Sequence, residues 1–171
     1  VRDFRRVLSR SRALCLPRFS GLPPAYEPPV DALRAALASV LKQTYGDWEL
    51  VLVDDCSPSP KIRKVLRAAA ADPRITVIER ASNGGIVAAS NDAIAAATGE
   101  FLVLLDNDDL LPPEALEKVA SPLAGDPLVH FVYPDRDKIG LDGPHYDEFR
   151  KPAWSPRRLR GPLSTAPLSA R

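Results

Sequence analysis

Short apolar runs alternate with stretches of helical periodicity through most of the chain. Four runs have the length and apolar composition of buried β-strands, at residues 49–55, 75–78, 101–105 and 129–133. Apolar spacing and helix start and stop signals predict helices over residues 30–41, 61–71 and 86–97 and from Pro112-Pro113-Glu114 onward. Strands that alternate with helices are typical of a layered α/β fold, with a mostly parallel sheet flanked by helices.

Local signals add detail to this pattern. The third helix has one apolar face, which is expected to be buried and is formed by Ile86, Ala89, Ala93, Ile94 and Ala97. Gly99 stands where a helix cap belongs, and Asp142-Gly143 predicts a hairpin turn.

The composition is that of a soluble globular protein of one domain, since 45% of the 171 residues are hydrophobic and 26% are charged. A formal net charge of +1 gives no overall field that recruits nucleic acid or anionic lipid. Arginines crowd both ends of the chain, but without the repeated aromatic residues on which bases stack. We therefore expect solvated tails and no nucleic-acid partner.

The few cysteines and histidines limit the chemistry further. Cys15 and Cys56 are far apart, with no Cys-x-x-Cys pair and no secretory segment, which predicts a reduced, cytoplasmic protein with Cys56 buried. His130 and His145 are too few and too scattered for a zinc site. The longest apolar runs are of strand length, so we expect no transmembrane segment.

Three carboxylates follow the strand at 101–105, within Asp106-Asn107-Asp108-Asp109. Ligands of open α/β sheets bind beyond the carboxyl ends of the strands, so chemistry is expected here. Two like charges at about 4 Å repel by about 1 to 4 kcal/mol, and a divalent cation would turn that repulsion into coordination. Carboxylate oxygens suit Mg2+ or Mn2+. The alternative is a solvated acidic loop that caps the next helix, and the residues alone leave both open.

Two further groups occupy positions where a nucleotide could bind. Asp54-Asp55 ends a strand, where a carboxylate can accept hydrogen bonds from a ribose or from the imide N–H of uracil or thymine. A helix cap by Asp55 or Ser57 is the alternative. Asn83-Gly84-Gly85 precedes a helix, where glycine permits close backbone approach and leaves N–H groups for an anion. Asn-Gly is also a common turn, and that interpretation is the safer one.

Other ligand-binding motifs do not fit the sequence. A calcium EF-hand loop begun at Asp106 would need Asp or Asn in place of Leu110 and Gly in place of Leu111. A phosphatase of the haloacid dehalogenase type fits less well, because Leu110 stands where Thr or Val is expected. Neither a Rossmann Gly-x-Gly-x-x-Gly fingerprint nor a Walker phosphate-binding loop is present.

Taken together and in order, the motifs resemble those of family 2 glycosyltransferases. The matching segments are Val53-Asp54-Asp55, Asn83-Gly84-Gly85 with Asn91, Thr98-Gly99-Glu100 and Leu105-Asp106-Asn107-Asp108-Asp109. Residues 39–45 match the family's helix before the second strand. Residues 133–138 and 151–156 are similar to a bacterial subgroup that makes O-antigen and rhamnan-type polysaccharides. The resemblance runs from residue 24 to residue 156.

The resemblance implies a GT-A fold, in which a nucleotide-binding α/β half precedes an acceptor half that is truncated in this chain. Residues 18–156 would form the nucleotide-sugar-binding domain, between a basic tail at 1–17 and an irregular tail at 157–171. The implied activity is inverting transfer of a sugar from a UDP- or dTDP-sugar to a growing surface polysaccharide or lipid-linked acceptor. A peripheral position at the inner membrane stays open.

The resemblance also implies roles for single residues. Asp55 would contact the base near Tyr26, Asp106 the ribose or the metal, and Asp108 the Mn2+ or Mg2+ that bridges the donor's diphosphate. The implied nucleotide-sugar-binding residues are Tyr26, Asp54, Asp55, Asn83, Gly84, Gly85, Asn91, Asp106 and Asn107. The implied metal ligands are Asp106 and Asp108.

The chain departs from the family pattern in two places. Residues 18–23, Arg-Phe-Ser-Gly-Leu-Pro, replace a strongly apolar first strand, so we expect a poor central strand and an unpaired sheet edge. The family's catalytic base lies farther downstream than Asp135 and Asp137, so no base is assigned.

Two rival functions therefore stay open. One is a truncated or degenerate glycosyltransferase that binds nucleotide without catalysis. The other is a nucleotidyltransferase on a related scaffold, which would need a Gly-rich loop with a basic residue after the first strand; the sequence has none.

Overall fold

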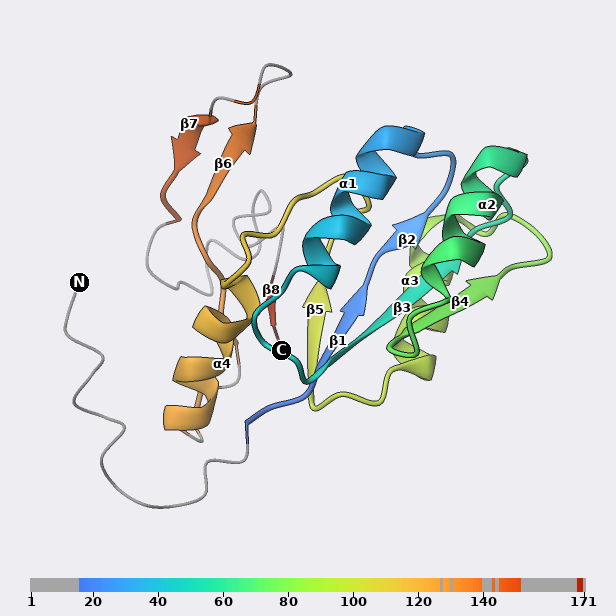
Figure 1. Cartoon of the computed structure of the whole chain (residues 1–171). Helices are drawn as coiled ribbons and strands as arrows, with labels where there is room; N and C mark the ends of the chain where they lie inside the picture. The colour runs from blue at the N-terminus through green and yellow to red at the C-terminus, as the bar shows by residue number, and fades with distance from the viewer. Residues whose placement is uncertain are drawn as a thin grey trace.

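The computed structural model describes residues 16–126, 128–129, 131–139, 143, 145–151 and 169–170. A six-stranded sheet with helices on both faces makes up most of this part (Figure 1). Its strands are β1 (Phe19–Leu22), β2 (Pro24–Ala25), β3 (Trp48–Asp54), β4 (Ile75–Glu79), β5 (Phe101–Leu104) and β8 (Ser169–Ala170). All paired strands are parallel except β5 and β8. The expected α/β fold with a mostly parallel sheet is confirmed.

The order of the strands and their common direction together define the two edges of the sheet that are used below. β1 and β2 follow each other along one side of β3, and β4 pairs with its other side. β5 pairs with β1, and β8 lies beyond β5. Because β1 to β5 are parallel, all of them end along one edge, which we call the carboxyl edge. All of them begin along the opposite, amino edge.

The segment expected to make a poor central strand is a buried strand at the centre of the sheet. Phe19 of β1 pairs in register with Trp48 of β3 on one side and with Phe101 of β5 on the other. All four residues of β1 are buried. Gly21 leaves room for Leu50, whose Cδ1 would lie 2.7 Å from a Cβ at that position. The expectation was wrong because the arginine and the proline fall outside the strand and the glycine serves a close contact.

Helices cover both faces of the sheet, with α1 and α2 in front and α3 behind in Figure 1. α1 (Val30–Leu41), α2 (Pro60–Ala69) and α4 (Ala115–Gly125) contribute to the larger hydrophobic cluster. α3 (Gly85–Ala96) packs on the other face, over a smaller cluster. The helix predicted to open at the two prolines begins after them, at Ala115.

Helix α3 packs through a narrower face than its sequence predicts. Ala89 and Ala93 are fully buried, whereas Ile86 and Ile94 are 66% and 44% exposed. An ion pair ties Asp92, on the opposite flank of the helix, to the segment after β4 and so fixes how the helix is turned. The expectation that the whole apolar face is buried was therefore wrong for the two isoleucines.

A separate hairpin follows α4 and lies at the upper left of Figure 1. β6 (Arg136–Ile139) and β7 (His145–Phe149) form a two-stranded antiparallel sheet. Gly143, in the predicted turn, has a φ of 90°, and Asp142 lies outside the described residues. The strand predicted at 129–133 is wrong for the described positions there, where only Val132 forms a bridge. Val132 instead packs against the larger hydrophobic cluster.

Two sequence expectations concern the surface. Cys56 is exposed in the turn after β3, where its φ is 64°, so the prediction that it is buried was wrong. Within the described part of the chain, no helix combines the length and the apolar character needed to cross a membrane. Cys15, His130 and most of both predicted tails lie outside the described residues.

Candidate functional site

The segments singled out from the sequence meet along the carboxyl edge of the sheet. Tyr26 follows β2, Asp54 ends β3 and Asp55 follows it, and residues 106–109 come after β5. The loop at residues 83–85 joins β4 to α3 at the same edge. Parallel pairing of the strands therefore gathers segments that lie up to 83 positions apart in the sequence, as expected for a ligand site in an open α/β sheet.

Two hydrogen bonds to β2 connect the segments of this edge. The backbone N–H of Asp55 donates to the carbonyl of Ala25 at 2.9 Å. From the other side, Nδ2 of Asn107 donates to the carbonyl of Pro24 at 2.7 Å. The short strand β2 thus links the end of β3 to the acidic loop after β5, and Tyr26, whose exposed fraction is 54%, lies next to this link.

Asp54 is buried and closes the turn that follows β3. Its Oδ1 accepts a hydrogen bond from the backbone N–H of Ser57 at 3.0 Å. The Oγ of Ser57 in turn accepts from the backbone N–H of Glu27 at 3.2 Å, and Glu27 accepts from the N–H of Ser59 at 2.9 Å. Asp54 therefore shapes the site by holding the β2 and β3 turns together. Neither Asp55 nor Ser57 caps α2, whose N-cap is Ser59.

Asp55 is bound on both carboxylate oxygens by groups of the protein. Its Oδ1 accepts from the backbone N–H of Gly84 at 2.9 Å and from Nη1 of Arg80 at 2.5 Å, and Oδ2 accepts from the N–H of Gly85 at 2.7 Å. The Gly84 hydrogen bond is the largest cause that lowers the pKa of Asp55 below its ordinary value. The two glycine N–H groups expected to face a ligand anion thus bind this carboxylate instead.

Arg80 is a site residue that the sequence motifs missed. Its Nε donates to Oδ2 of Asp92 at 2.7 Å while Nη1 binds Asp55, so one guanidinium joins β3 to α3. A Cβ at Gly84 would collide with this guanidinium, which explains the glycine. The sequence does contain a signal, because Arg80 directly follows a predicted strand, β4. That strand pairs with β3, whose end carries Asp54 and Asp55.

The rest of the glycine loop is exposed, and Asn91 lies apart from it. Oδ1 of Asn83 accepts a second hydrogen bond from the N–H of Gly85 at 3.2 Å, and Gly85 has a φ of 80°. The loop is therefore a tight turn that only glycine adopts easily at that position. Asn91 has an exposed side chain in the middle of α3.

The acidic loop after β5 has an electrostatic character that suits a cation. Burial raises the pKa of Asp106, and the neighbouring charge of Asp108 raises it further. In the described part of the chain, no cluster of three or more His, Cys, Asp and Glu side chains could hold a metal ion. Mg2+ and Mn2+ are often bound by one or two carboxylates together with substrate phosphates, so Asp106 and Asp108 fit such a site without a third residue.

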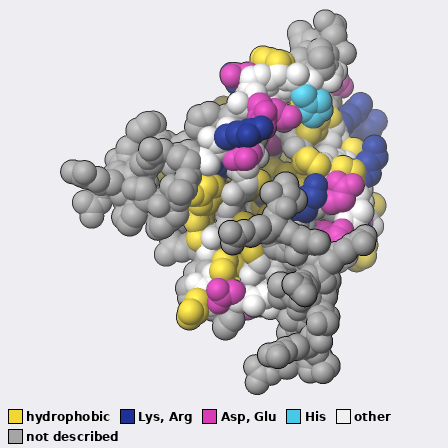
Figure 2. All heavy atoms as spheres, turned by 90° about the vertical axis from the view of Figure 1, so that its left-hand side faces the viewer, with side chains coloured by type: hydrophobic (Ala, Val, Ile, Leu, Met, Phe, Trp, Pro, Cys, Tyr) yellow, Lys and Arg dark blue, Asp and Glu magenta, His cyan; other side chains and the backbone are white. Residues whose placement is uncertain are grey.

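The acidic residues of the hairpin are engaged within it. Oδ1 of Asp135 accepts from the backbone N–H of Lys151 at 2.6 Å, and Oδ2 of Asp137 lies 2.6 Å from Nδ1 of His145. Figure 2 views this side of the molecule, and its upper part shows acidic and basic side chains gathered around a histidine. The catalytic base therefore stays unassigned.

Comparison with known proteins shows the family to which the chain is similar. A protein-family model described as "Glycosyl transferase family 2" matches residues 24–167. The O-antigen biosynthesis protein RfbC of Myxococcus xanthus is 39% identical over 145 residues, which cover 84% of this chain and 11% of RfbC. The UDP-Glc:alpha-D-GlcNAc-diphosphoundecaprenol beta-1,3-glucosyltransferase WfgD of Escherichia coli is 39% identical over 85 residues, 50% of this chain and 33% of WfgD.

A solved structure shares the fold. The mannosyltransferase PcManGT from Pyrobaculum calidifontis, in complex with GDP-Man and Mn2+, superposes with a TM-score of 0.58 and 28% identity. The superposition covers 76% of this chain and 40% of that protein. The chain thus spans between 11% and 40% of the length of these three proteins.

Proposed function

Because this chain belongs to glycosyl transferase family 2, which its match over residues 24–167 shows, we propose that it binds a nucleoside-diphosphate sugar at its carboxyl edge. The sugar passes, with inversion at its anomeric carbon, to a growing surface polysaccharide or a lipid-linked acceptor. The reaction depends on Mn2+ or Mg2+ and takes place in the cytoplasm.

The resemblance drawn from the sequence is confirmed at the level of the family. The relatives include glycosyltransferases and an O-antigen biosynthesis protein, which is the polysaccharide type that was expected. The fold is that of GT-A glycosyltransferases, as the superposition with PcManGT indicates. The relatives therefore support a transferase, and the proposal concerns its donor, metal and acceptor.

One observation carries the proposal: the acidic loop with Asp106 and Asp108 lies beside the ends of β2 and β3. The hydrogen bond from Asn107 to Pro24 holds this arrangement. Burial raises the pKa of Asp106, the charge of Asp108 raises it further, and a bound cation would act in the opposite direction. This arrangement supports a site for a diphosphate and its metal at the acidic loop.

The donor would be held by groups from three strand ends. Asp106 and Asp108 would hold the cation, which neutralises charge that develops on the leaving nucleoside diphosphate. The exposed ring of Tyr26 offers a surface on which the base can stack. Asp55, held in place by Gly84, Gly85 and Arg80, keeps an oxygen lone pair that can accept the imide N–H of uracil or thymine.

The relatives support the classes of donor and acceptor. WfgD takes UDP-Glc and a diphosphoundecaprenol-linked sugar, according to its name, and PcManGT was solved with GDP-Man and Mn2+. A UDP- or dTDP-sugar agrees with the first of these. The second makes a guanine nucleotide the comparison that a binding experiment must include.

Calorimetry tests the proposal directly. UDP, dTDP and GDP are titrated into the protein with MnCl2 and, separately, with a chelator. We expect Mn2+ to tighten UDP or dTDP binding by more than about tenfold, the equivalent of ~1.4 kcal/mol, and Asp108→Asn to abolish that gain. Asp47→Asn serves as the matched control, because Asp47 is an exposed aspartate at the amino edge.

Three outcomes would count against this function. Equal UDP affinity with and without Mn2+ would remove the metal from the proposal. A preference for GDP would remove the pyrimidine. The absence of binding by any nucleotide, in a protein that unfolds cooperatively, would overturn the donor site itself.

A further inference from the structure

Helix α2 carries a concentration of positive charge that the donor site does not use. Its sequence, PKIRKVLRAA, has four basic residues and no acidic one. Ile62, Val65 and Leu66 face the core, which turns the basic residues outward. We call this surface the basic face of α2; it consists of Lys61, Arg63, Lys64 and Arg67.

Most of this charge is not neutralised within the described structure. Lys61 and Lys64 are exposed and form no ion pair with a described residue. Arg67 pairs with Glu79 at 3.4 Å, but both side chains are largely solvated, at 71% and 43% exposed, so the pair is weak. The local charge of α2 is therefore strongly positive although the chain as a whole carries only +1.

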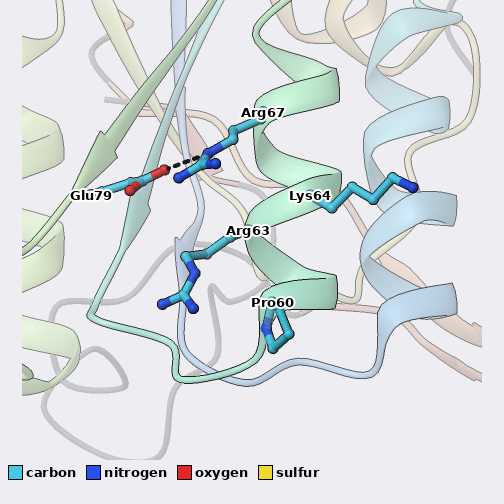
Figure 3. A pocket seen from close by; sticks show the side chains of 5 residues that line it. All are labelled: Pro60, Arg63, Lys64, Arg67 and Glu79. Carbon is cyan, nitrogen blue, oxygen red and sulfur yellow. Dashed lines mark hydrogen bonds and ion pairs between the residues drawn. The ribbon is translucent and has the colours of Figure 1, made fainter.

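The basic side chains spread over both sides of the helix. In Figure 3, Arg63 and Arg67 extend to the β4 side of α2, whereas Lys64 extends toward α1. Together with Pro60 and Glu79, these three basic residues line an open hollow of about 500 Å3. Converging cations would suit a single phosphate group. Cations that spread along and across a helix instead match an extended surface on which negative charges are distributed.

The basic face borders the candidate site. α2 begins at the carboxyl edge, five residues after Asp55. Nη1 of Arg63 donates to the carbonyl of Ser57 at 3.1 Å, and Nη2 donates to the carbonyl of Pro58 at 3.4 Å. These bonds attach the helix to the same turn that Asp54 closes. A surface held against α2 would therefore lie next to the edge where the donor is expected.

We propose that the basic face of α2 docks the protein on an anionic phospholipid bilayer and so brings its donor site to a lipid-linked acceptor. This rests on the proposed function, in which the acceptor is held in a membrane. Nucleic acid fits less well, because α2 carries no aromatic residue on which bases could stack.

We expect the basic face of α2 to attach reversibly to the bilayer. Each Lys or Arg near an anionic membrane surface contributes about fivefold to the partition coefficient, the equivalent of ~1 kcal/mol. Attraction of this kind is screened by salt, since the Debye length falls to about 3 Å at 1 M ionic strength. The attachment should therefore require anionic lipid and weaken steeply as salt is added.

Vesicle sedimentation with the full chain tests the proposal. The probes are vesicles of phosphatidylcholine mixed with phosphatidylglycerol, and vesicles of phosphatidylcholine alone. We expect binding to the anionic vesicles only, and a loss of at least about 25-fold in the variant Lys61→Glu/Lys64→Glu. Glutamate is a good helix former and is favourable near a helix N-terminus, so α2 should stay folded in this variant.

A matched control separates the basic face from overall charge. The variant Lys42→Glu/Lys118→Glu makes the same change in net charge on exposed lysines of α4 and the α1 C-cap, and it should bind anionic vesicles like the unchanged protein. Equal loss in both variants would overturn the proposal, as would absent or salt-independent binding. Tighter binding to double-stranded DNA through Lys61 and Lys64 than to vesicles would overturn it in favour of a nucleic-acid surface.

UDP binding with Mn2+ is measured on the same variants, so that the two proposals fail separately. If the α2 variant loses vesicle binding but keeps UDP affinity, the docking surface is supported beside an intact donor site. If no variant binds UDP while vesicle binding follows α2, the donor proposal fails and the surface alone is supported.

Discussion

Carboxylates cluster at both edges of the sheet, but their surroundings differ in kind. At the amino edge, Glu49 of β3 accepts hydrogen bonds from Oγ of Ser20 at 2.5 Å, from the N–H and hydroxyl of Thr98 at 2.5 and 2.8 Å, and from the N–H of Gly99 at 3.1 Å. Burial raises the pKa of Glu49, but these bonds outweigh it and lower the pKa to about 2. The ionised form is therefore strongly favoured by the fold.

At the carboxyl edge, Asp106 is in the opposite state. The described residues supply no hydrogen bond to its carboxylate, and burial together with Asp108 raises its pKa. The difference indicates that the fold stabilises the charge of Glu49, whereas it disfavours the charge of Asp106, which an added cation would favour. Asp55 shows that position alone does not decide this, since it lies at the carboxyl edge and accepts three hydrogen bonds from the protein.

The largest expected effect follows from the saturated carboxylate at the amino edge. Glu49→Gln keeps the shape of the side chain but removes its charge and places an amide N–H2 among donors. Hydrogen bonds to charged groups contribute about 1.5–3 kcal/mol, so the free energy of unfolding should fall by about 2 kcal/mol in urea at pH 7. Glu79→Gln, which loses only an exposed ion pair, should change it by less than about 0.5 kcal/mol.

The same carboxylate predicts a pH dependence. Because the folded pKa of Glu49 is about 2 and its ordinary value is 4.5, its contribution is complete above pH 4.5 and is lost as the pH falls toward 2. The stability difference between the unchanged protein and Glu49→Gln should therefore shrink across that window. A difference that stays constant from pH 7 to pH 2 would show that the charge of Glu49 is not what matters.

A smaller, local effect is expected for Asp55, the carboxylate that the protein binds at the carboxyl edge. Asp55→Ala removes the acceptor of the Gly84 and Gly85 N–H groups and leaves Arg80 paired with Asp92 alone. Hydrogen exchange of these two amides should accelerate by roughly tenfold or more, because lost charge-assisted bonds favour local opening. NMR or mass spectrometry can follow this exchange residue by residue.

Asp72→Ala is the matched control for that experiment. Asp72 also binds an arginine, but it lies at the amino edge. The pair is bidentate: Nε of Arg74 donates to Oδ1 of Asp72 at 3.0 Å, and Nη2 donates to Oδ2 at 2.8 Å. Its removal should leave the exchange of Gly84 and Gly85 unchanged. Acceleration in both variants would mean that the loop responds to global stability and that Asp55 has no special hold on it.

Much of the arrangement was predictable because it depends on local pattern. The strand at 101–105 and the helix at 30–41 follow from apolar periodicity, and both are found within one residue of their predicted ends. The position of the acidic segments at one edge follows from the rule that parallel strands end together. The roles of Asp106 and Asp108 stay predictions, since they depend on ligands.

The rest depends on contacts between distant segments. Gly99 was expected to cap a helix, yet a Cβ there would lie 2.5 Å from Oγ of Ser20 and 2.9 Å from the carbonyl of Arg18, so it serves a close approach to β1. The ion pairs of Arg80 require α3 and β3 to meet, which no local pattern encodes. The central place of β1 was likewise invisible, because its burial comes from neighbours on both sides and not from its own composition.

The smallest effect on the stability of the metal-free protein is expected at Asp108, in the acidic loop that contrasts most with Glu49. Because the pKa of Asp106 is raised in the folded protein, ionised Asp106 costs stability as the pH rises through that pKa. Asp108→Asn removes one source of the repulsion, so the pKa of Asp106 should fall, and the free energy of unfolding at pH 7 should change by less than about 0.5 kcal/mol. Asp47→Asn should leave the pKa of Asp106 unchanged.

NMR titration of the carboxyl carbons measures the pKa of Asp106, and thermal unfolding with and without excess Mn2+ measures the coupling to metal. Mn2+ should raise the Tm of the unchanged protein and of Asp47→Asn, since a ligand stabilises the state that binds it, but not that of Asp108→Asn. A clear loss of apo stability in Asp108→Asn would place Asp108 with Glu49 among the carboxylates that hold the fold, and would end the contrast between the two edges.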